Sequence, residues 1–382
     1  MIKKPIFIVA LTVVVFLLVA VAGLGFYYYQ VNLKLDALSQ QLQALNEKTS
    51  HLAQNILDTS DIYTRIEKSV VKIEVRQNSG EDVSGSGFIF DSLGHIVTNN
   101  HVVGNSNKIE VVFSDGNILK AGFVGGDVYS DLAVIKLAEP VTAYPLTLAD
   151  SDTLKVGDAV IAVGSPFGLG GSVTSGIVSQ KGRLLALEVG YSIPDIIQFD
   201  AAINKGNSGG PLLNSKSEVV GVTTALTFSG GIPAFAGVGF AISSNMIAKV
   251  IPSLIEKGKY EHSWLGINVT SLTPVIVEAM GLKVCRGLLI TEVLEDSPAQ
   301  KAGLKGGSTQ LIVGDGSINV GGDIVIGIDA VDIKSVEDLL SYLGRKNPGD
   351  EATLRIIRDG AEQSVTLTLG VRPLPLEQSP QD

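Results

Sequence analysis

The chain has 382 residues, more than twice the size of a typical domain, so we expect two or three folded units. Its 29 Lys and Arg residues against 39 Asp and Glu give a formal net charge of −10, which argues against a binder of nucleic acid. One cysteine excludes an intrachain disulfide framework, and no Cys/His group has the spacing of a structural zinc site. We therefore expect neither a metal nor a cofactor.

Residues 1–30 predict a short cytoplasmic tip followed by a transmembrane helix. The run from Ile6 to Tyr29 is apolar and long enough, as a helix, to cross a hydrocarbon core of roughly 30 Å. Lys3 and Lys4 precede it, and the positive-inside bias places the rest of the chain outside the cytoplasm, in the periplasm or the extracellular space. The alternative is a secreted protein after signal-peptide cleavage, because Ala20-Val21-Ala22 has the A-x-A form.

Residues 31–58 predict a helical stalk. Apolar residues recur there with alternating spacings of three and four, with one polar position, at Leu35, Leu38, Leu42, Leu45, Thr49, Leu52 and Ile56. This spacing is typical of a short coiled coil, which would make the protein an oligomer. The alternative is an amphipathic helix that lies on the globular part.

Residues 59–256 predict a domain of many short strands. Val70–Val75, Lys108–Phe113 and Leu132–Leu137 mix apolar and polar residues between turn signals, as does the later segment Val173–Val178. Ser243-Ser244-Asn245 then predicts the start of a helix that runs to about Lys257. The absence of βα alternation favours one double barrel over a nucleotide-binding fold.

The segment Gly206-Asn207-Ser208-Gly209-Gly210-Pro211 is the motif with the clearest chemistry. Small residues on both sides of Ser208 let the backbone turn sharply and expose the hydroxyl. The string also matches G-x-S-x-G, the nucleophile elbow of α/β-hydrolases, in which a histidine follows the serine. His262 is the only histidine after Ser208, and no strand–helix alternation surrounds it. The general base must therefore lie upstream.

Among the upstream histidines, His101 stands where polar residues follow a β-branched run, as expected at the end of a strand. Asp131 lies thirty residues further on and opens an apolar strand. The order His101, Asp131, Ser208 is that of the chymotrypsin-type catalytic triad. His95 is expected in a hairpin turn, and His262 in a linker.

Several motifs resemble those of the HtrA (Deg) family of serine proteases, in its membrane-anchored type with one PDZ domain. They are Thr98–Val103, Ser130–Val134, Gly164–Gly168, Asp200–Leu212 and Gly237–Ser243. The resemblance implies a mostly β chain with a chymotrypsin-like double β-barrel protease domain and a homotrimeric assembly. It makes Ser208 the nucleophile, His101 the general base and acid, and Asp131 the residue that orients the histidine. It also implies an oxyanion hole formed by the backbone N–H groups of Gly206 and Ser208.

Ala202 lies six residues before the nucleophile, where trypsin-like enzymes carry the carboxylate of their primary specificity pocket. We therefore predict cleavage after small or medium aliphatic residues. Ile203, Ala225 and Leu226 are the further candidates for the substrate pocket.

Asn207 stands where the digestive enzymes place an aspartate that pairs with a newly cut N-terminus. The resemblance implies instead that loops around the site become ordered when a peptide or a neighbouring subunit binds. The candidate loops are Pro166–Ser172, Leu184–Ile193 and Thr227–Phe235. The alternative is that these segments are plain connections.

Residues 257–375 resemble an α+β PDZ domain, followed by a tail at 376–382. The resemblance rests on Trp264–Ile267, Gly287–Ile290, Ser297–Ala299, Gly303-Leu304, Gly322–Val325 and Ser335–Leu340. It implies that backbone N–H groups of Leu265, Gly266 and Ile267 bind a peptide carboxylate, beside an edge that accepts the peptide as an added strand. The alternative is a structural hairpin. An insertion at Ser308–Val320 departs from the family pattern.

Together these features predict an ATP-independent serine endopeptidase of extracytoplasmic protein quality control or stress response. Its expected partners are unfolded or partially folded proteins, C-terminal peptides at the PDZ domain, and the membrane. The rival hypothesis is a chaperone-like or scaffold protein that binds such chains without cutting them.

Overall fold

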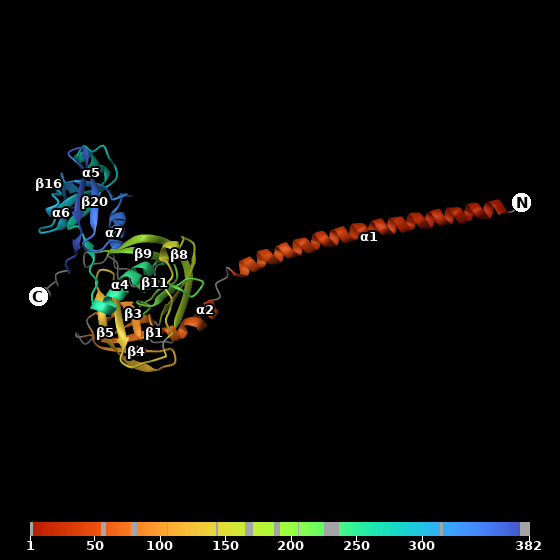
Figure 1. Ribbon diagram of the computed structural model, residues 1–382, viewed down its shortest axis with the longest axis horizontal. Helices are drawn as coiled ribbons and strands as arrows, with labels where there is room; N and C mark the ends of the chain where they lie inside the picture. The colour runs from red at the N-terminus through yellow and green to blue at the C-terminus, as the bar shows by residue number, and fades with distance from the viewer. Residues whose placement is uncertain are drawn as a thin grey trace. The chain divides into compact units, whose positions relative to one another are not determined.

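The computed structural model describes residues 3–54, 59–77, 82–104, 106–142, 144–164, 171–186, 192–204, 206–224, 237–313 and 316–374. The chain divides into two compact units, residues 1–58 and residues 59–382. Figure 1 labels α1 of the first unit and many of the helices and strands of the second.

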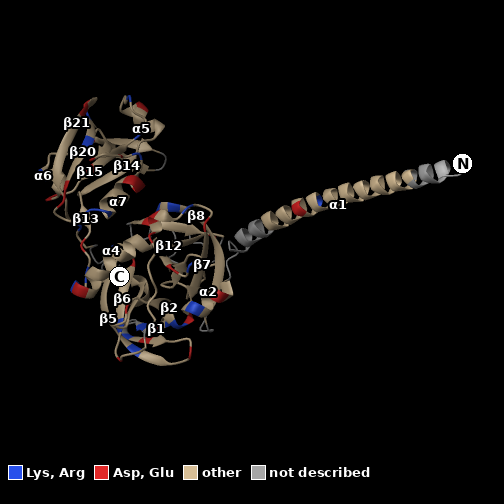
Figure 2. Ribbon diagram, turned by 45° about the vertical axis from the view of Figure 1, so that its right-hand side comes forward, with Lys and Arg blue, Asp and Glu red and all other residues tan. Residues whose placement is uncertain are grey.

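The first unit is the helix α1 (Lys3–Gln54), which is continuous over 52 residues. Its segment Val13–Leu45 is long and apolar enough to cross a membrane. Most of the described part of α1 in Figure 2 is tan, the colour of residues that are neither Lys, Arg, Asp nor Glu. Leu35, Leu38, Leu42 and Leu45 are all more than half exposed. The predicted seam thus presents a row of exposed leucines; the side chains of Thr49 and Leu52, and all of Ile56, lie outside the described residues.

The second unit begins with α2 (Thr59–Ile66) and the 3₁₀ turn η1 (Glu67–Ser69), which lead into a closed barrel. The barrel order is β1-β2-β3-β6-β5-β4. The strands are β1 (Val70–Gln77), β2 (Asp82–Ile89), β3 (His95–Asn99), β4 (Ser106–Val112), β5 (Ile118–Asp127) and β6 (Leu132–Leu137). Inward-facing aliphatic side chains such as Ile73, Ile96 and Ile135 are fully buried, and their burial stabilises the barrel.

A second closed barrel follows, with the order β10-β11-β12-β9-β8-β7. Its strands are β7 (Ala159–Gly164), β8 (Ser172–Ala186), β9 (Ser192–Phe199), β10 (Pro211–Leu213), β11 (Val219–Thr224) and β12 (Gly239–Ser243), and the 3₁₀ turn η2 (Ser151–Thr153) precedes β7. Phe199 and Leu212 are fully buried at its centre. The predicted double barrel is confirmed.

The strand β8 is much longer than the predicted strand Val173–Val178, because irregular pairing with β9 extends it to Ala186. Both ends of the candidate loop Leu184–Ile193 are therefore strand residues. Its middle, most of Pro166–Ser172 and all of Thr227–Phe235 lie outside the described residues. His95, expected in a turn, is instead the first residue of β3.

The predicted helix after the second barrel is confirmed as α4 (Ser244–Lys257). The Ser243 hydroxyl accepts a hydrogen bond from the Met246 N–H at 3.3 Å and caps its first turn. Gly258 ends the helix in the left-handed conformation, with φ of 74°.

The PDZ domain contains a sheet in the order β14-β15-β18-β20-β21, with β19 paired to β18. The segment Ser308–Val320, predicted as an insertion, contains the antiparallel hairpin β16–β17. The elements are β13 (Ser263–Trp264), β14 (Ile267–Ser271), α5 (Pro274–Ala279), β15 (Leu288–Val293), α6 (Pro298–Lys301), β16 (Thr309–Val313), β17 (Gly316–Val320), β18 (Ile324–Ile328), β19 (Val331–Asp332), α7 (Val336–Gly344), β20 (Glu351–Arg358), β21 (Ala361–Thr368) and β22 (Gly370–Val371). β13 pairs with β22, so the first and last strands of the domain lie side by side.

Candidate active site and peptide groove

His101 lies on α3 (Asn100–Val103), a single helical turn that directly follows β3. Its neighbours Val102 and Val103 are buried in the core of the first barrel, and they anchor the turn. The imidazole itself is 30% exposed. The local sequence therefore fixes the backbone of His101 while its ring stays accessible.

Asp131 lies in the turn between β5 and β6 and holds the imidazole of His101. Its Oδ2 is 2.8 Å from Nδ1 of His101, and its Oδ1 accepts the backbone N–H of the same residue at 2.9 Å. Thr224, at the end of β11, donates its hydroxyl to Oδ2 at 3.3 Å. Asp131 is buried and has a φ of 55°, a left-handed conformation that Asp tolerates better than most residues. The structure thus brings together the histidine and the aspartate that the sequence predicted as partners.

Ser208 lies on the loop between β9 and β10 and is clamped by Ser86 of the first barrel. The N–H of Ser86 donates to the carbonyl of Ser208 at 2.7 Å, and the Ser86 hydroxyl donates to the carbonyl of Gly206 at 2.6 Å. An added Cβ at Gly85 would be 2.8 Å from a methyl of Val102 and 3.1 Å from the carbonyl oxygen of Ser208. Ser208 and the turn that carries His101 are therefore immediate neighbours.

The glycine that follows Ser208 is required by its surroundings. Gly209 has a φ of 87°, and a Cβ there would come within 2.2 Å of the Ser86 carbonyl oxygen and 2.3 Å of the Thr98 hydroxyl. Only glycine fits such an approach between the two barrels. The backbone of this loop is also held by Thr223, whose hydroxyl donates to the carbonyl of Asn207 at 2.6 Å.

The predicted substrate-pocket residues occupy different environments. Ala202 is half-buried, and its carbonyl accepts the hydroxyl of Thr174 at 2.9 Å. Ile203 packs into the core of the second barrel. Ala225 and Leu226 lie outside the described residues, as does Lys205, which precedes the predicted oxyanion donor Gly206.

The predicted carboxylate-binding residues line a groove in the PDZ domain. Among the described strands, β14 is at the edge of its sheet, and α7 lies across from it. The groove has a volume of about 350 Å³ and is lined by Leu265, Gly266, Ile267, Asn268 and Val269 on one side and by Val336, Leu339, Leu340 and Leu343 on the other. Gly266 has a φ of 82°, and a Cβ there would lie 2.1 Å from that of Ser297. Apolar side chains dominate the two walls formed by β14 and α7, whereas His262 and Arg372 make one end of the groove polar.

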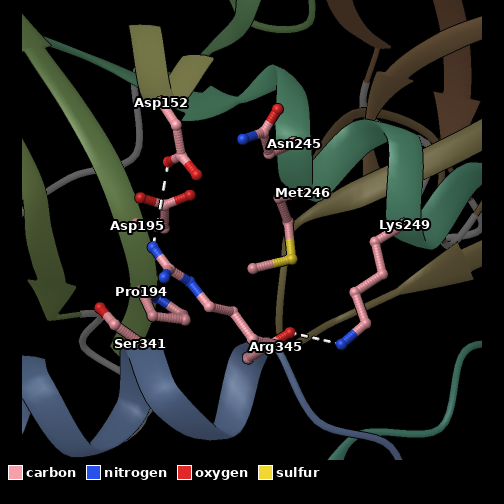
Figure 3. A pocket seen from close by; sticks show the side chains of 9 residues that line it. Asp152, Pro194, Asp195, Asn245, Met246, Lys249, Ser341 and Arg345 are labelled. Atoms are coloured by element: carbon pink, nitrogen blue, oxygen red, sulfur yellow. Dashed lines mark hydrogen bonds and ion pairs between the residues drawn. The ribbon is translucent and has the colours of Figure 1, made fainter. Parts of the chain in front are cut away.

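A smaller cavity of about 230 Å³ lies where α7 meets the protease domain (Figure 3). The ammonium of Lys249, on α4, donates to the carbonyls of Gly344 and Lys346 at the end of α7. Burial lowers the pKa of Lys249. Burial raises the pKa of Asp195 on the opposite wall, an effect partly offset by a hydrogen bond from the Ser243 hydroxyl. The charged side chain of Lys249 thus connects the protease domain to the end of α7.

Sequence reasoning missed Ser86 and Thr224, the side chains that hold the loop of Ser208 and the carboxylate of Asp131. For Ser86 a signal existed, because Ser84-Gly85-Ser86-Gly87 places two glycines inside a strand, a pattern that marks close backbone approach. It also missed Tyr129, His262 and Arg372, which line one end of the groove between β14 and α7.

Residues 85–222 match the trypsin-like peptidase domain family, and residues 263–369 match the PDZ domain family. The solved structure of the HtrA-type protease AlgW with a tripeptide is 32% identical with a TM-score of 0.69, and the match covers 83% of this chain and 98% of that one. The chain belongs to the HtrA family of serine proteases. A serine endoprotease structure from Yersinia pestis has a TM-score of 0.60 at 29% identity, over 83% of this chain and 98% of that one.

The curated relatives of this chain are longer than the part of their sequences that it matches. The probable periplasmic serine endoprotease DegP-like of Bartonella henselae is 38% identical over 82% of this chain and 58% of its own length. The periplasmic serine endoprotease DegP of Escherichia coli is 40% identical over 75% of this chain and 56% of its own. The chain therefore spans a little more than half the length of these curated HtrA proteins.

Proposed function

We propose that this protein is a membrane-anchored, ATP-independent serine endopeptidase of periplasmic protein quality control, and that peptides bound to its PDZ domain regulate it. The observation that carries the proposal is the 2.8 Å pair of His101 Nδ1 and Asp131 Oδ2 beside the loop of Ser208. The names of the DegP-like relatives, which describe periplasmic serine endoproteases, support the compartment and the endopeptidase activity.

In the proposed reaction, the Ser208 hydroxyl attacks the carbonyl carbon of a peptide bond while Nε2 of His101 accepts its proton. Asp131 holds the ring through Nδ1, which fixes the productive tautomer and stabilises the imidazolium that forms. Backbone N–H groups of Gly206 and Ser208 stabilise the oxyanion, an effect of about 3 kcal/mol per donor. His101 then returns the proton to the leaving amine, and a water molecule hydrolyses the acyl-enzyme by the same steps.

We assign the primary specificity to small or medium aliphatic residues, because Ala202 offers no charge to a basic side chain. A library of internally quenched peptides, varied at the residue before the scissile bond, tests this assignment. We expect faster cleavage after Val, Ala or Ile than after Lys or Arg. A preference for Lys or Arg would refute it.

The central test is the degradation of β-casein, an unfolded protein, by the full-length chain in detergent without ATP. Wild type should produce fragments, whereas Ser208→Ala should produce none. Asp131→Asn should lower kcat by about 10⁴-fold, because the amide that replaces the carboxylate holds His101 in the unproductive tautomer. If Ser208→Ala and wild type bind casein equally and neither cuts it, the chaperone-like alternative is correct.

For the PDZ domain we propose that the groove between β14 and α7 binds an apolar C-terminal peptide as an added strand, with its carboxylate on the N–H groups of Leu265, Gly266 and Ile267. Fluorescent peptides with a free carboxylate should bind, and the same peptides with an amidated terminus should not. Gly266→Ala should abolish binding, because its Cβ would overlap Ser297. Equal binding of acid and amide would refute the carboxylate site.

The exposed leucine row of α1 supports a homotrimer with a coiled-coil stalk, and its apolar segment supports a single-pass anchor. The mass of the detergent-solubilised protein tests the first assignment. Retention in the membrane fraction after alkaline extraction tests the second, since a secreted form would be released.

A further inference from the structure

His262 lies between α4 and β13, on the segment that leads into the PDZ domain, and it contacts the protease domain. Its Nε2 is 2.7 Å from Oδ2 of Asp127, with side chains that are only 17% and 3% exposed. The rings of Tyr260 and Tyr129 meet the imidazole edge to face, with centroids 4.7 Å and 5.5 Å away. The pair is therefore enclosed by aromatic rings.

Asp127 in turn holds the turn that ends at the catalytic aspartate. Its Oδ1 accepts the N–H of Tyr129 at 3.2 Å, and its Oδ2 accepts the N–H of Ser130 at 3.2 Å. The Ser130 hydroxyl donates to the same Oδ2. Asp131 is the next residue, so the carboxylate of Asp127 sets the backbone from which the catalytic side chain projects.

The C-terminal segment of the PDZ domain contacts the same turn. The guanidinium of Arg372 lies 3.8 Å from the centroid of the Tyr129 ring, and the Tyr129 hydroxyl donates to the carbonyl of Pro373. The N–H of Arg372 donates to the carbonyl of His262 at 2.9 Å. Entry and exit segments of the PDZ domain therefore converge on the turn at 127–131.

We propose that His262 is a positioning residue for catalysis: through Asp127 it holds the turn at 127–131 so that Asp131 meets His101. The inference rests on the triad of the proposed function. Without His262, one oxygen of a buried carboxylate loses a donor, and the turn relieves this cost by opening toward water. A displacement of about 1 Å at a catalytic group can lower the rate by about a hundredfold.

The test uses two amide variants that differ in reach. Gln at position 262 places its amide nitrogen near the position of Nε2, so His262→Gln keeps a donor for Asp127. His262→Asn places its nitrogen short of that position. The matched control is His95→Gln in the same barrel. Nδ1 of His95 lies 2.6 Å from Oδ2 of Asp91. The amide nitrogen of Gln extends beyond the position of Nδ1, so this variant loses a histidine–aspartate pair that is separate from the turn at 127–131.

Each full-length variant is assayed in detergent with an internally quenched peptide, and the rate of Ser208 phosphonylation by a fluorophosphonate is measured. The fluorophosphonate endpoint counts the competent sites, so kcat refers only to folded enzyme. We expect His262→Asn to lower kcat and the phosphonylation rate at least tenfold with KM within twofold. His262→Gln should stay within threefold of wild type, and His95→Gln should lower the melting temperature without changing kcat.

Three results would overturn the inference: wild-type kcat in His262→Asn, equal losses in the Asn and Gln variants, or an equal loss in His95→Gln. The triad is tested separately by Asp131→Asn. Full activity of Asp131→Asn would reject the proposed mechanism itself. An inactive Asp131→Asn beside a fully active His262→Asn would reject only the role of His262.

Discussion

Gly209→Ala, compared with Gly116→Ala, separates the effect of backbone strain at a positive φ from the effect of steric overlap by the added Cβ. Gly209 has a φ of 87°, and its Cβ would lie 2.2 Å from the backbone oxygen of Ser86. Gly116, in the turn between β4 and β5, has a φ of 86° and no described atom within 4 Å of its Cβ position. The two alanine variants therefore carry the same backbone strain, and only Gly209→Ala adds a steric overlap.

The strain common to both variants costs about 1–2 kcal/mol of the free energy of unfolding. The overlap at Gly209 adds about 1–3 kcal/mol, because the nearest group, the Ser86 carbonyl, belongs to the backbone and cannot rotate away. Relief of the overlap must move the loop away from Ser86, and with it the carbonyl of Ser208 that accepts the Ser86 N–H. A shift of about 1 Å at the nucleophile lowers kcat/KM by about a hundredfold.

The assay combines thermal unfolding with cleavage of a quenched peptide. Gly116→Ala should lower the melting temperature by a few degrees and leave kcat/KM unchanged. Gly209→Ala should lower the melting temperature further and kcat/KM by about two orders of magnitude. Wild-type kcat/KM in Gly209→Ala would show that the loop does not need the close approach between the barrels.

Two further predictions concern charged side chains. Burial raises the pKa of Asp195, so the folded state holds this proton more tightly than the unfolded chain, and stability is lost as the pH rises above 3.8, the ordinary value. Asp195→Asn should therefore raise the melting temperature at pH 7, with a gain that vanishes below pH 3.8; a gain independent of pH would contradict this reasoning. Arg358→Met should lower the free energy of unfolding of the PDZ domain in urea by about 3–5 kcal/mol, because Asp323 is 1% exposed and would stay buried without its partner. Arg355→Met is the control, since its partner Asp332 is 68% exposed and the loss should be below about 1 kcal/mol; equal losses would contradict the burial argument.

The sequence predicted the architecture because its signals are local. Strand runs between turn residues located the barrels, and Ser243 marked the start of α4. The pairing of His101 with Asp131 could also be anticipated, because their order and spacing relative to the glycine-flanked Ser208 match the chymotrypsin-type triad. Their order relative to Ser208 then excluded the α/β-hydrolase alternative.

The supporting contacts could not be predicted in this way. Thr224 reaches Asp131 from the other barrel, 93 residues along the chain, and a threonine at the end of a strand is unremarkable in sequence. The pairing of His262 with Asp127 spans 135 residues and depends on where the PDZ domain joins the barrels. The length of β8 was underestimated because its pairing with β9 shifts register repeatedly, which disrupts the alternation that marks a strand.

The pairing of β13 with β22 has a consequence for how proteins of this design diversify. Trp264 lies opposite Gly370, so the two ends of the segment 265–369 lie side by side. Such a module can be exchanged by recombination without rerouting the rest of the chain. His262 and Arg372 lie outside the exchanged segment, so the contacts to the catalytic turn would survive. The side chains of β14 and α7 can therefore change in evolution without altering the contacts of His262 and Arg372 to the turn at 127–131.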